Sequence, residues 1–96
     1  MNELEVWRDI KGFEGLYQVS NAGNVKSFVK YSQGKLMVGH ARAGGYLGIK
    51  LTKDSIGSQL QISRLVAEAF IPNPDNLPEV NHKDEDRQNN HAWNLE

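Results

Sequence analysis

Apolar and polar residues alternate over short stretches of the first sixty residues, a pattern typical of β-strands rather than of long helices. Apolar positions around Gly12 and Gly15 predict a tight turn before a short strand over 16–20. The Asn-Ala-Gly-Asn run at 21–24 predicts a hairpin turn, because Gly and Asn tolerate positive φ. The returning strand is expected over 25–31.

Weaker β signals follow this hairpin. The expected elements, in order, are a turn at 33–34, a strand over 36–40, a break at the Ala-Gly-Gly run 43–45, a strand around 46–51, a loop over 54–58 and a short strand over 59–62. The first sixty residues are therefore expected to be mostly antiparallel β.

The chain changes character after residue 62. Ser63 is positioned to cap a helix over 64–70, where four apolar residues share one face, and Pro72 prevents its continuation. A short strand is expected over 79–82 and a polar loop over 83–94. The predicted class is α+β, with a small antiparallel β-rich module at 1–60 followed by a short helix and a second unit at 61–96.

Composition limits the kinds of site that this chain can carry. With 96 residues and 39% hydrophobic content, it can bury one small core. It has no cysteine, which excludes disulfides and cysteine-based zinc sites and leaves His40, His82 and His91 with carboxylates and amides as metal ligands. Without a signal peptide or an apolar run of eighteen residues, a soluble intracellular protein is expected.

The charges are segregated along the chain although they nearly cancel. Residues 24–53 contain no acid and six bases, hence a charge of +6, and these bases are Lys26, Lys30, Lys35, Arg42, Lys50 and Lys53. Such a stretch predicts a surface for the phosphate backbone of double-stranded DNA. An ordinary solvated lysine face is the alternative. Arg42 is the best candidate for close approach to a DNA backbone, because only Ala and Gly flank it.

The segment 81–94 concentrates two histidines, four asparagines and three acids. It permits three interpretations. A calcium loop lacks the expected acidic spacing and closing Glu, a structural loop would satisfy its own backbone, and a nuclease loop would hold a divalent metal. The residues alone do not choose between the last two.

Longer motifs point to a family. The run Arg64-Leu-Val-Ala-Glu-Ala-Phe-Ile-Pro-Asn-Pro, with Glu79-Val-Asn-His-Lys-Asp, Asn89-Asn90 and Asn94-Leu95-Glu96, resembles the HNH endonucleases of phages and group I introns. The stretch from Trp7 to Ser27 resembles the modular DNA-binding motif that often precedes this nuclease domain. Together the two matches cover most of the chain.

The resemblance implies a ββα-metal site with one divalent ion, Mg²⁺ or Mn²⁺. By position, His82 would be the general base, Asn81 the metal ligand, and Asn94 the residue that fixes the loop and orients the base. A neutral imidazole can accept a proton from the attacking water while the ion stabilises charge on the phosphate. His91 matches no invariant family position and is expected to be an exposed loop histidine.

Departures from the family pattern qualify this assignment. Asn81 stands where Asp or His is usual, and an amide is a weaker ligand for a hard cation. Glu85 stands where Gly is common, so it would be strained if the turn needs positive φ. The family's second metal ligand lies on a later helix, so the HNH motif is expected to be incomplete when the chain stops at Glu96.

Two functions are therefore expected to compete. One is a metal-dependent DNA endonuclease in which His82 activates water. The other is a catalytically inactive DNA-binding or inhibitory module. A third, weaker alternative is protein binding through the acidic residues 84–86. In the first two cases the partner is double-stranded DNA, and we expect a monomer without membrane association in the cytoplasm of a phage-infected or prophage-carrying bacterium.

Overall fold

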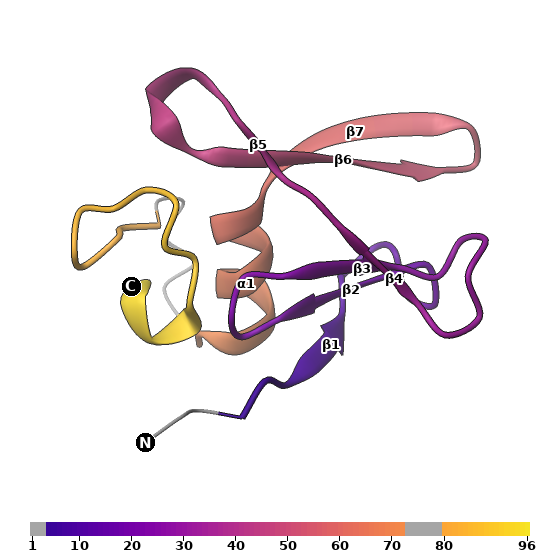
Figure 1. Cartoon of the computed structure of the whole chain (residues 1–96), viewed down its shortest axis with the longest axis horizontal. Coiled ribbons are helices and arrows are strands. Elements are labelled where there is room, and N and C mark those ends of the chain that lie inside the picture. Colours follow the sequence, from indigo (N-terminus) through magenta and orange to yellow (C-terminus); the bar gives the residue numbers. More distant parts are fainter. Residues whose placement is uncertain (1–3, 73–79) are drawn as a thin grey trace.

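The computed structural model describes residues 4–72 and 80–96. Figure 1 shows two small β-sheets, a helix that contacts both of them, and a C-terminal loop beside that helix. The elements are β1 (Trp7–Asp9), β2 (Tyr17–Ser20), β3 (Val25–Ser27), β4 (Lys35–Met37), β5 (His40–Ala41), η1 (Ala43–Gly45), β6 (Leu47–Lys53), β7 (Ile56–Gln61), α1 (Ile62–Phe70) and η2 (Ala92–Asn94). This arrangement confirms the predicted α+β class.

Sheet A is an antiparallel meander in the order β1-β2-β3-β4. The predicted hairpin at 21–24 joins β2 and β3, with Val19 opposite Val25. The returning strand was predicted too long, because β3 ends at Ser27 and the residues after it form bends and turns. Strand β1 was not predicted, because its three residues are too short a sample to show an alternation.

Sheet B contains β5-β6-β7, again antiparallel. The loop predicted over 54–58 is wrong, because β7 already begins at Ile56. Asp54 and Ser55 alone make the turn, with φ of 52° and 65°. Positive φ at both central residues is what a two-residue type I′ hairpin turn requires. Because neither residue is Gly, the sequence did not reveal this turn.

The strand predicted over 36–40 is in fact two strands in different sheets. β4 ends at Met37 in sheet A, and β5 starts at His40 in sheet B. Gly39 lies at the crossing, where a Cβ would be 2.6 Å from Cδ1 of Ile62 and 3.3 Å from the carbonyl oxygen of Gly48. The crossing therefore needs a residue without a side chain.

Helix α1 follows β7 directly and contacts β2, β6, β7 and η2. It begins at Ile62 with Gln61 in the cap position and no side-chain cap, so the capping role predicted for Ser63 is wrong. Ser63 lies inside the helix and is buried. The helix ends at Phe70, as predicted. Arg8 of β1 donates a hydrogen bond to the carbonyl oxygen of Ala69 near this end.

One core joins both sheets, the helix and the C-terminal segment. Its buried apolar residues are Ile10, Tyr17, Val19, Val25, Ile49, Leu51, Ile62, Leu65, Val66 and Leu95. The Tyr17 hydroxyl adds a polar link between the sheets, because it accepts from the Thr52 amide at 3.1 Å and donates to the Thr52 carbonyl at 3.3 Å. Both predicted units, 1–60 and 61–96, thus contribute to the same core, and the boundary between them stays a prediction.

In the described residues, α1 is far shorter than a membrane span requires, and no other helix reaches that length. The strand expected over 79–82 begins at a residue outside the described ones. From 81 onward the chain pairs with residues 94–96.

Leu51→Ala should lower the free energy of unfolding by about 2–5 kcal/mol, because Leu51 is fully buried in the core shared by both sheets and the helix. Chemical denaturation measures the change. Ile56→Ala on the neighbouring strand is the matched control, since Ile56 is 69% exposed, and its effect should stay within about 0.5 kcal/mol. Equal effects would contradict the placement of the core.

Candidate nuclease loop and nucleic-acid interface

The segment 81–96 forms a closed loop on a short antiparallel stem. Asn81 and Glu96 exchange two backbone hydrogen bonds of 3.0 Å, and the Lys83 amide donates to the Asn94 carbonyl at 2.8 Å. His82 and Leu95 face each other across this stem. Because Leu95 is part of the core, the stem attaches the polar loop to both sheets and the helix.

The side chain of Asn94 holds this loop together from inside. It is 1% exposed, and its Nδ2 donates to Oδ1 of Asp84 and to the carbonyl oxygen of Asn89, each at 2.9 Å. Its Oδ1 accepts from the Asp84 amide at 3.1 Å. One amide group therefore spans the loop, as expected for a residue that fixes it. A catalytic role for Asn94 stays a prediction.

The carboxylate of Asp84 accepts several hydrogen bonds from within the loop. Side-chain hydrogen bonds from Asn89 and Asn94, with a backbone bond from Asp86, hold the pKa of its carboxyl below the ordinary aspartate value. The following turn needs a positive φ, which Glu85 supplies with 65°. The positive φ that strains a residue other than Gly is thus present at Glu85, and the surrounding hydrogen bonds hold the strained backbone.

His82 is buried at the base of the loop, with 5% of its surface exposed. Its Nε2 donates to Oδ1 of Asn90 at 2.9 Å, and Asn90 is itself 4% exposed. The ring of Tyr46 lies 5.9 Å away, tilted by 48°. Sequence reasoning did not find Asn90 or Tyr46 as neighbours of His82, because nothing in their spacing distinguishes them from other Asn and Tyr residues.

Asn81 lies on the exposed side of the stem, where its Nδ2 donates to Oε1 of Glu96 at 3.0 Å. The pair presents an amide oxygen and a carboxylate beside each other. Mg²⁺ takes oxygen ligands and commonly completes its shell with water and substrate phosphate, so these residues fit one edge of such a site. Within 4–72 and 80–96, no group of three or more His, Asp or Glu side chains is placed to hold a metal.

The loop is also seated against sheet A. The Ala92 amide donates to the carbonyl oxygen of Asn21 at 2.8 Å. At Gly23, which has a φ of 85°, an added Cβ would lie 2.9 Å from Cβ of Asn90. The β2–β3 turn thus needs Gly for its conformation and also for its close contact with the residue that holds His82.

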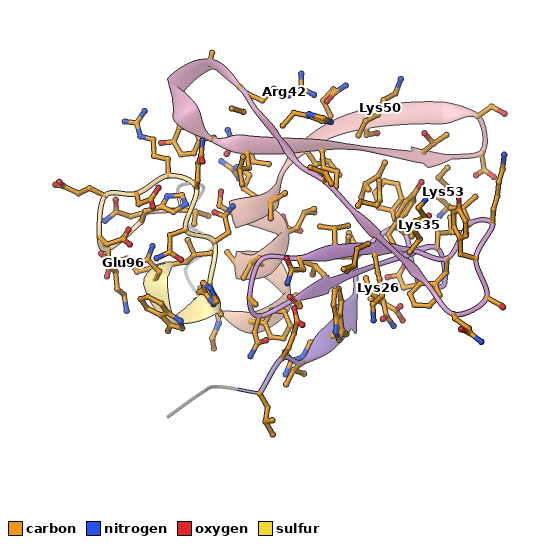
Figure 2. The ribbon with its side chains drawn as sticks, viewed as in Figure 1. Lys26, Lys35, Arg42, Lys50, Lys53 and Glu96 are labelled. Carbon is orange, nitrogen blue, oxygen red and sulfur yellow. The ribbon has the colours of Figure 1, made fainter. Side chains whose placement is uncertain are left out.

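Two of the six predicted DNA-binding residues share one surface. Arg42 and Lys50 lie on the side of sheet B away from α1 (Figure 2). Arg42 crosses Gly48 and donates to Oε1 of Gln59, and Lys50 lies over Gly57. A Cβ at either glycine would collide with the basic side chain above it. We call this surface, with Lys50, Gln59 and Gln61 exposed on it, the outer face of sheet B.

The other four bases lie elsewhere. Lys53 points toward sheet A and donates to the Gly12 carbonyl at 3.0 Å. Lys26 sits 4.0 Å above the ring of Trp7, and Lys35 lies 5.1 Å from that of Tyr31. Lys30 is exposed in the segment between β3 and β4. The basic stretch that looks continuous in sequence is therefore distributed over both sheets.

The chain is similar in sequence and in fold to known proteins. Residues 5–52, half of the chain, match the NUMOD4 motif family. Over 89 residues the chain is 42% identical to DNA endonuclease I-HmuI of Bacillus phage SP01, which covers 93% of this chain and 49% of that protein. A solved structure concerning DNA binding and cleavage by the HNH homing endonuclease I-HmuI superposes with a TM-score of 0.82, covering 94% of this chain and 50% of that one.

The chain belongs to the HNH homing endonuclease family. The uncharacterised HNH endonuclease L247 of Acanthamoeba polyphaga mimivirus is a further relative, 41% identical over 96% of this chain and 23% of its own length. The chain spans about half the length of I-HmuI. The predicted family is thus confirmed.

Two aromatic residues complete the closed loop of residues 81–96, which is called the HNH loop below. His91 and Trp93 stack with ring centroids 5.5 Å apart, and Trp93 is 55% exposed. His91 is half-buried rather than exposed as predicted, because Trp93 covers it.

The low pKa of Asp84 leads to a prediction about acid. A folded-state pKa below the unfolded one means that the carboxylate contributes stability above the ordinary aspartate pKa and loses it as the pH falls through the lower folded value. Asn89→Ala removes the largest cause and should raise the Asp84 pKa, measured by NMR titration of its carboxyl carbon. Gln88→Ala, one residue away, should leave that pKa unchanged. A pKa that is the same in wild type and Asn89→Ala would contradict the network.

Proposed function

We propose that this protein binds double-stranded DNA and catalyses its metal-dependent hydrolysis, with His82 as the general base. The observation that carries the proposal is the state of His82, which is buried and oriented by Asn90 in a loop fastened by Asn94. Family membership supports it, because I-HmuI is named as a DNA endonuclease. The proposed setting is the cytoplasm of a phage-infected or prophage-carrying bacterium, where the protein acts as a monomer.

The outer face of sheet B is the proposed DNA-binding surface. A β-ribbon can enter the major groove, where Arg reads guanine and Gln reads adenine through paired hydrogen bonds. Arg42, Gln59 and Gln61 supply those groups, and Lys50 supplies a charge for a phosphate. Strands β5, β6 and β7 contain no acidic residue, since Asp54 lies in the turn between β6 and β7. Lys26, Lys30 and Lys35 are secondary candidates for phosphate contact, whereas the ammonium group of Lys53 is bonded to the Gly12 carbonyl.

The proposed proton transfer gives different roles to the two ring nitrogens of His82. Because Oδ1 of Asn90 can only accept, Nε2 would carry the hydrogen of their bond, and in the neutral ring Nδ1 would be the nitrogen free to take a proton. Nδ1 would take a proton from water as the water oxygen bonds to phosphorus and the bond to the leaving oxygen breaks. A divalent ion held by Asn81 would stabilise negative charge on the phosphate and the leaving oxygen.

A DNA-binding module without turnover is the second candidate. The observation in its favour is that the described residues bring together no three His, Asp or Glu side chains for a metal. Its DNA-binding surface would be the same outer face. The two candidates therefore differ in cleavage and not in binding.

Lys50→Ala should weaken binding to a short DNA duplex, because one phosphate contact is lost. The slope of log K against log salt should fall in magnitude by about 1. Fluorescence anisotropy at several salt concentrations measures it. Lys53→Ala is the matched control, since Lys53 is bonded to the Gly12 carbonyl on the other side of β6. If Lys53→Ala weakened binding more than Lys50→Ala, the outer face of sheet B would not be the DNA-binding surface.

His82→Ala should reduce nicking of supercoiled plasmid in Mg²⁺ or Mn²⁺ by at least about 100-fold, because a general base is removed. Binding of the duplex should be nearly unchanged. His91→Ala is the matched control, since His91 belongs to the same loop but stacks on Trp93. Full nicking by His82→Ala would remove it as the base, and DNA binding without nicking by the wild type would favour the second candidate.

A further inference from the structure

Arg87 connects the HNH loop to the hairpin of sheet B. Its Nη1 donates to the carbonyl oxygen of Gly44 at 2.5 Å, across 43 positions of sequence. Its Cζ lies 4.9 Å from the ring centroid of Tyr46, a cation–π distance. A single exposed side chain therefore reaches from the loop to the β5–β6 connection and contacts it in two ways.

The β5–β6 connection is shaped to receive this arginine. Gly44 and Gly45 have φ of 84° and 82°. A Cβ at Gly44 would lie 3.3 Å from Nη1 of Arg87 and 3.3 Å from two ring carbons of Tyr46. The Ala-Gly-Gly run thus serves a close contact between two parts of the molecule in addition to a turn.

Tyr46 extends the connection to His82. The Arg87 guanidinium lies over the Tyr46 ring. The centroid of that ring is 5.9 Å from the centroid of the His82 ring. Its carbonyl oxygen accepts the Arg42 amide at 2.8 Å. The residue that packs beside His82 is therefore hydrogen-bonded through its backbone to a residue of the outer face of sheet B.

We propose that Tyr46 and Arg87 are positioning residues that hold the His82 loop in a fixed place relative to the outer face of sheet B. This inference rests on the proposed function for its consequence in cleavage. DNA held on sheet B then presents its phosphodiester to His82 at a defined distance, and small displacements of a reacting group reduce rates strongly. Neither side chain needs to touch the DNA.

The proposal differs measurably from direct phosphate binding by Arg87. A phosphate contact would make Arg87 variants bind DNA more weakly and with a smaller salt slope. Positioning instead leaves the dissociation constant unchanged and lowers the rate constant of cleavage in the bound complex.

The test compares Tyr46→Leu and Arg87→Gln with the conservative variant Tyr46→Phe, which keeps the ring. Single-turnover nicking with saturating protein should slow by about tenfold or more in the first two and remain near wild type in Tyr46→Phe. The dissociation constant for a 20–30-base-pair duplex should change less than about twofold. Weaker binding with an unchanged rate constant, or equal slowing in Tyr46→Phe, would overturn the proposal.

NMR of the free protein separates this inference from the proposed nuclease activity. In Tyr46→Leu and Arg87→Gln, the His82 ring signals should move and the amides of Glu85 and Asn89, which are hydrogen-bonded within the loop, should exchange faster. Tyr46→Phe should show neither change. If the wild type does not nick but these changes occur, the nuclease proposal fails and the positioning contact stands. Unchanged His82 signals and exchange rates in Tyr46→Leu and Arg87→Gln would overturn the positioning contact itself.

Discussion

The amide of Asn94 is the group on which the HNH loop depends. Loop 83–93 is polar apart from Ala92 and Trp93, so burial of apolar surface alone cannot hold its shape. Asn94 uses both amide hydrogens and its oxygen on partners at Asp84 and Asn89. Removing a buried amide leaves its partners without hydrogen bonds, which costs about 1–3 kcal/mol for each buried group. His82 keeps its place because the loop that carries Asn90 is closed in this way.

The loop is held from outside by two glycine-containing turns, one from each sheet. Gly23 lets the β2–β3 turn approach Asn90, and Gly44 lets the β5–β6 connection receive Arg87. Both sheets and α1 share one core, so the two turns stand at fixed places on either side of the loop. The NUMOD4 segment thus contributes to the surroundings of His82 as well as to its own sheet.

Local patterns predicted the elements that depend on local interactions. The β2–β3 hairpin with its Asn-Ala-Gly-Asn turn and the C-terminal end of α1 are cases in point, because turn chemistry and proline act over a few residues. The crossing at Gly39 was missed because the constraint comes from Ile62, far along the chain. The start of β7 at Ile56 is not evident from the sequence, which predicts a strand only over 59–62, because Asp54 and Ser55 adopt positive φ without being glycine.

For the candidate site too, the sequence predicts some residues, whereas others depend on contacts between distant parts of the chain. The motif predicted His82, Asn81 and Asn94 by position, and the structure places Asn94 at the centre of the loop. Asn90 and Tyr46 could not be predicted, because only the fold brings them to the His82 ring. The sequence predicts one surface for the six bases of 24–53, but strand alternation and the change of sheet after Met37 separate Arg42 and Lys50 from the rest.

DNA is proposed to lie on the outer face of sheet B, beside the HNH loop that carries His82. Chemical-shift mapping of the ¹⁵N-labelled protein with a short DNA duplex tests it most directly. DNA at this place should shift the amide signals of Arg42, Lys50, Gln59 and Gln61 and of loop residues 83–90, with little change in β1 and β2. Shifts confined to sheet A around Lys26 and Lys35, with the outer face of sheet B unaffected, would contradict it.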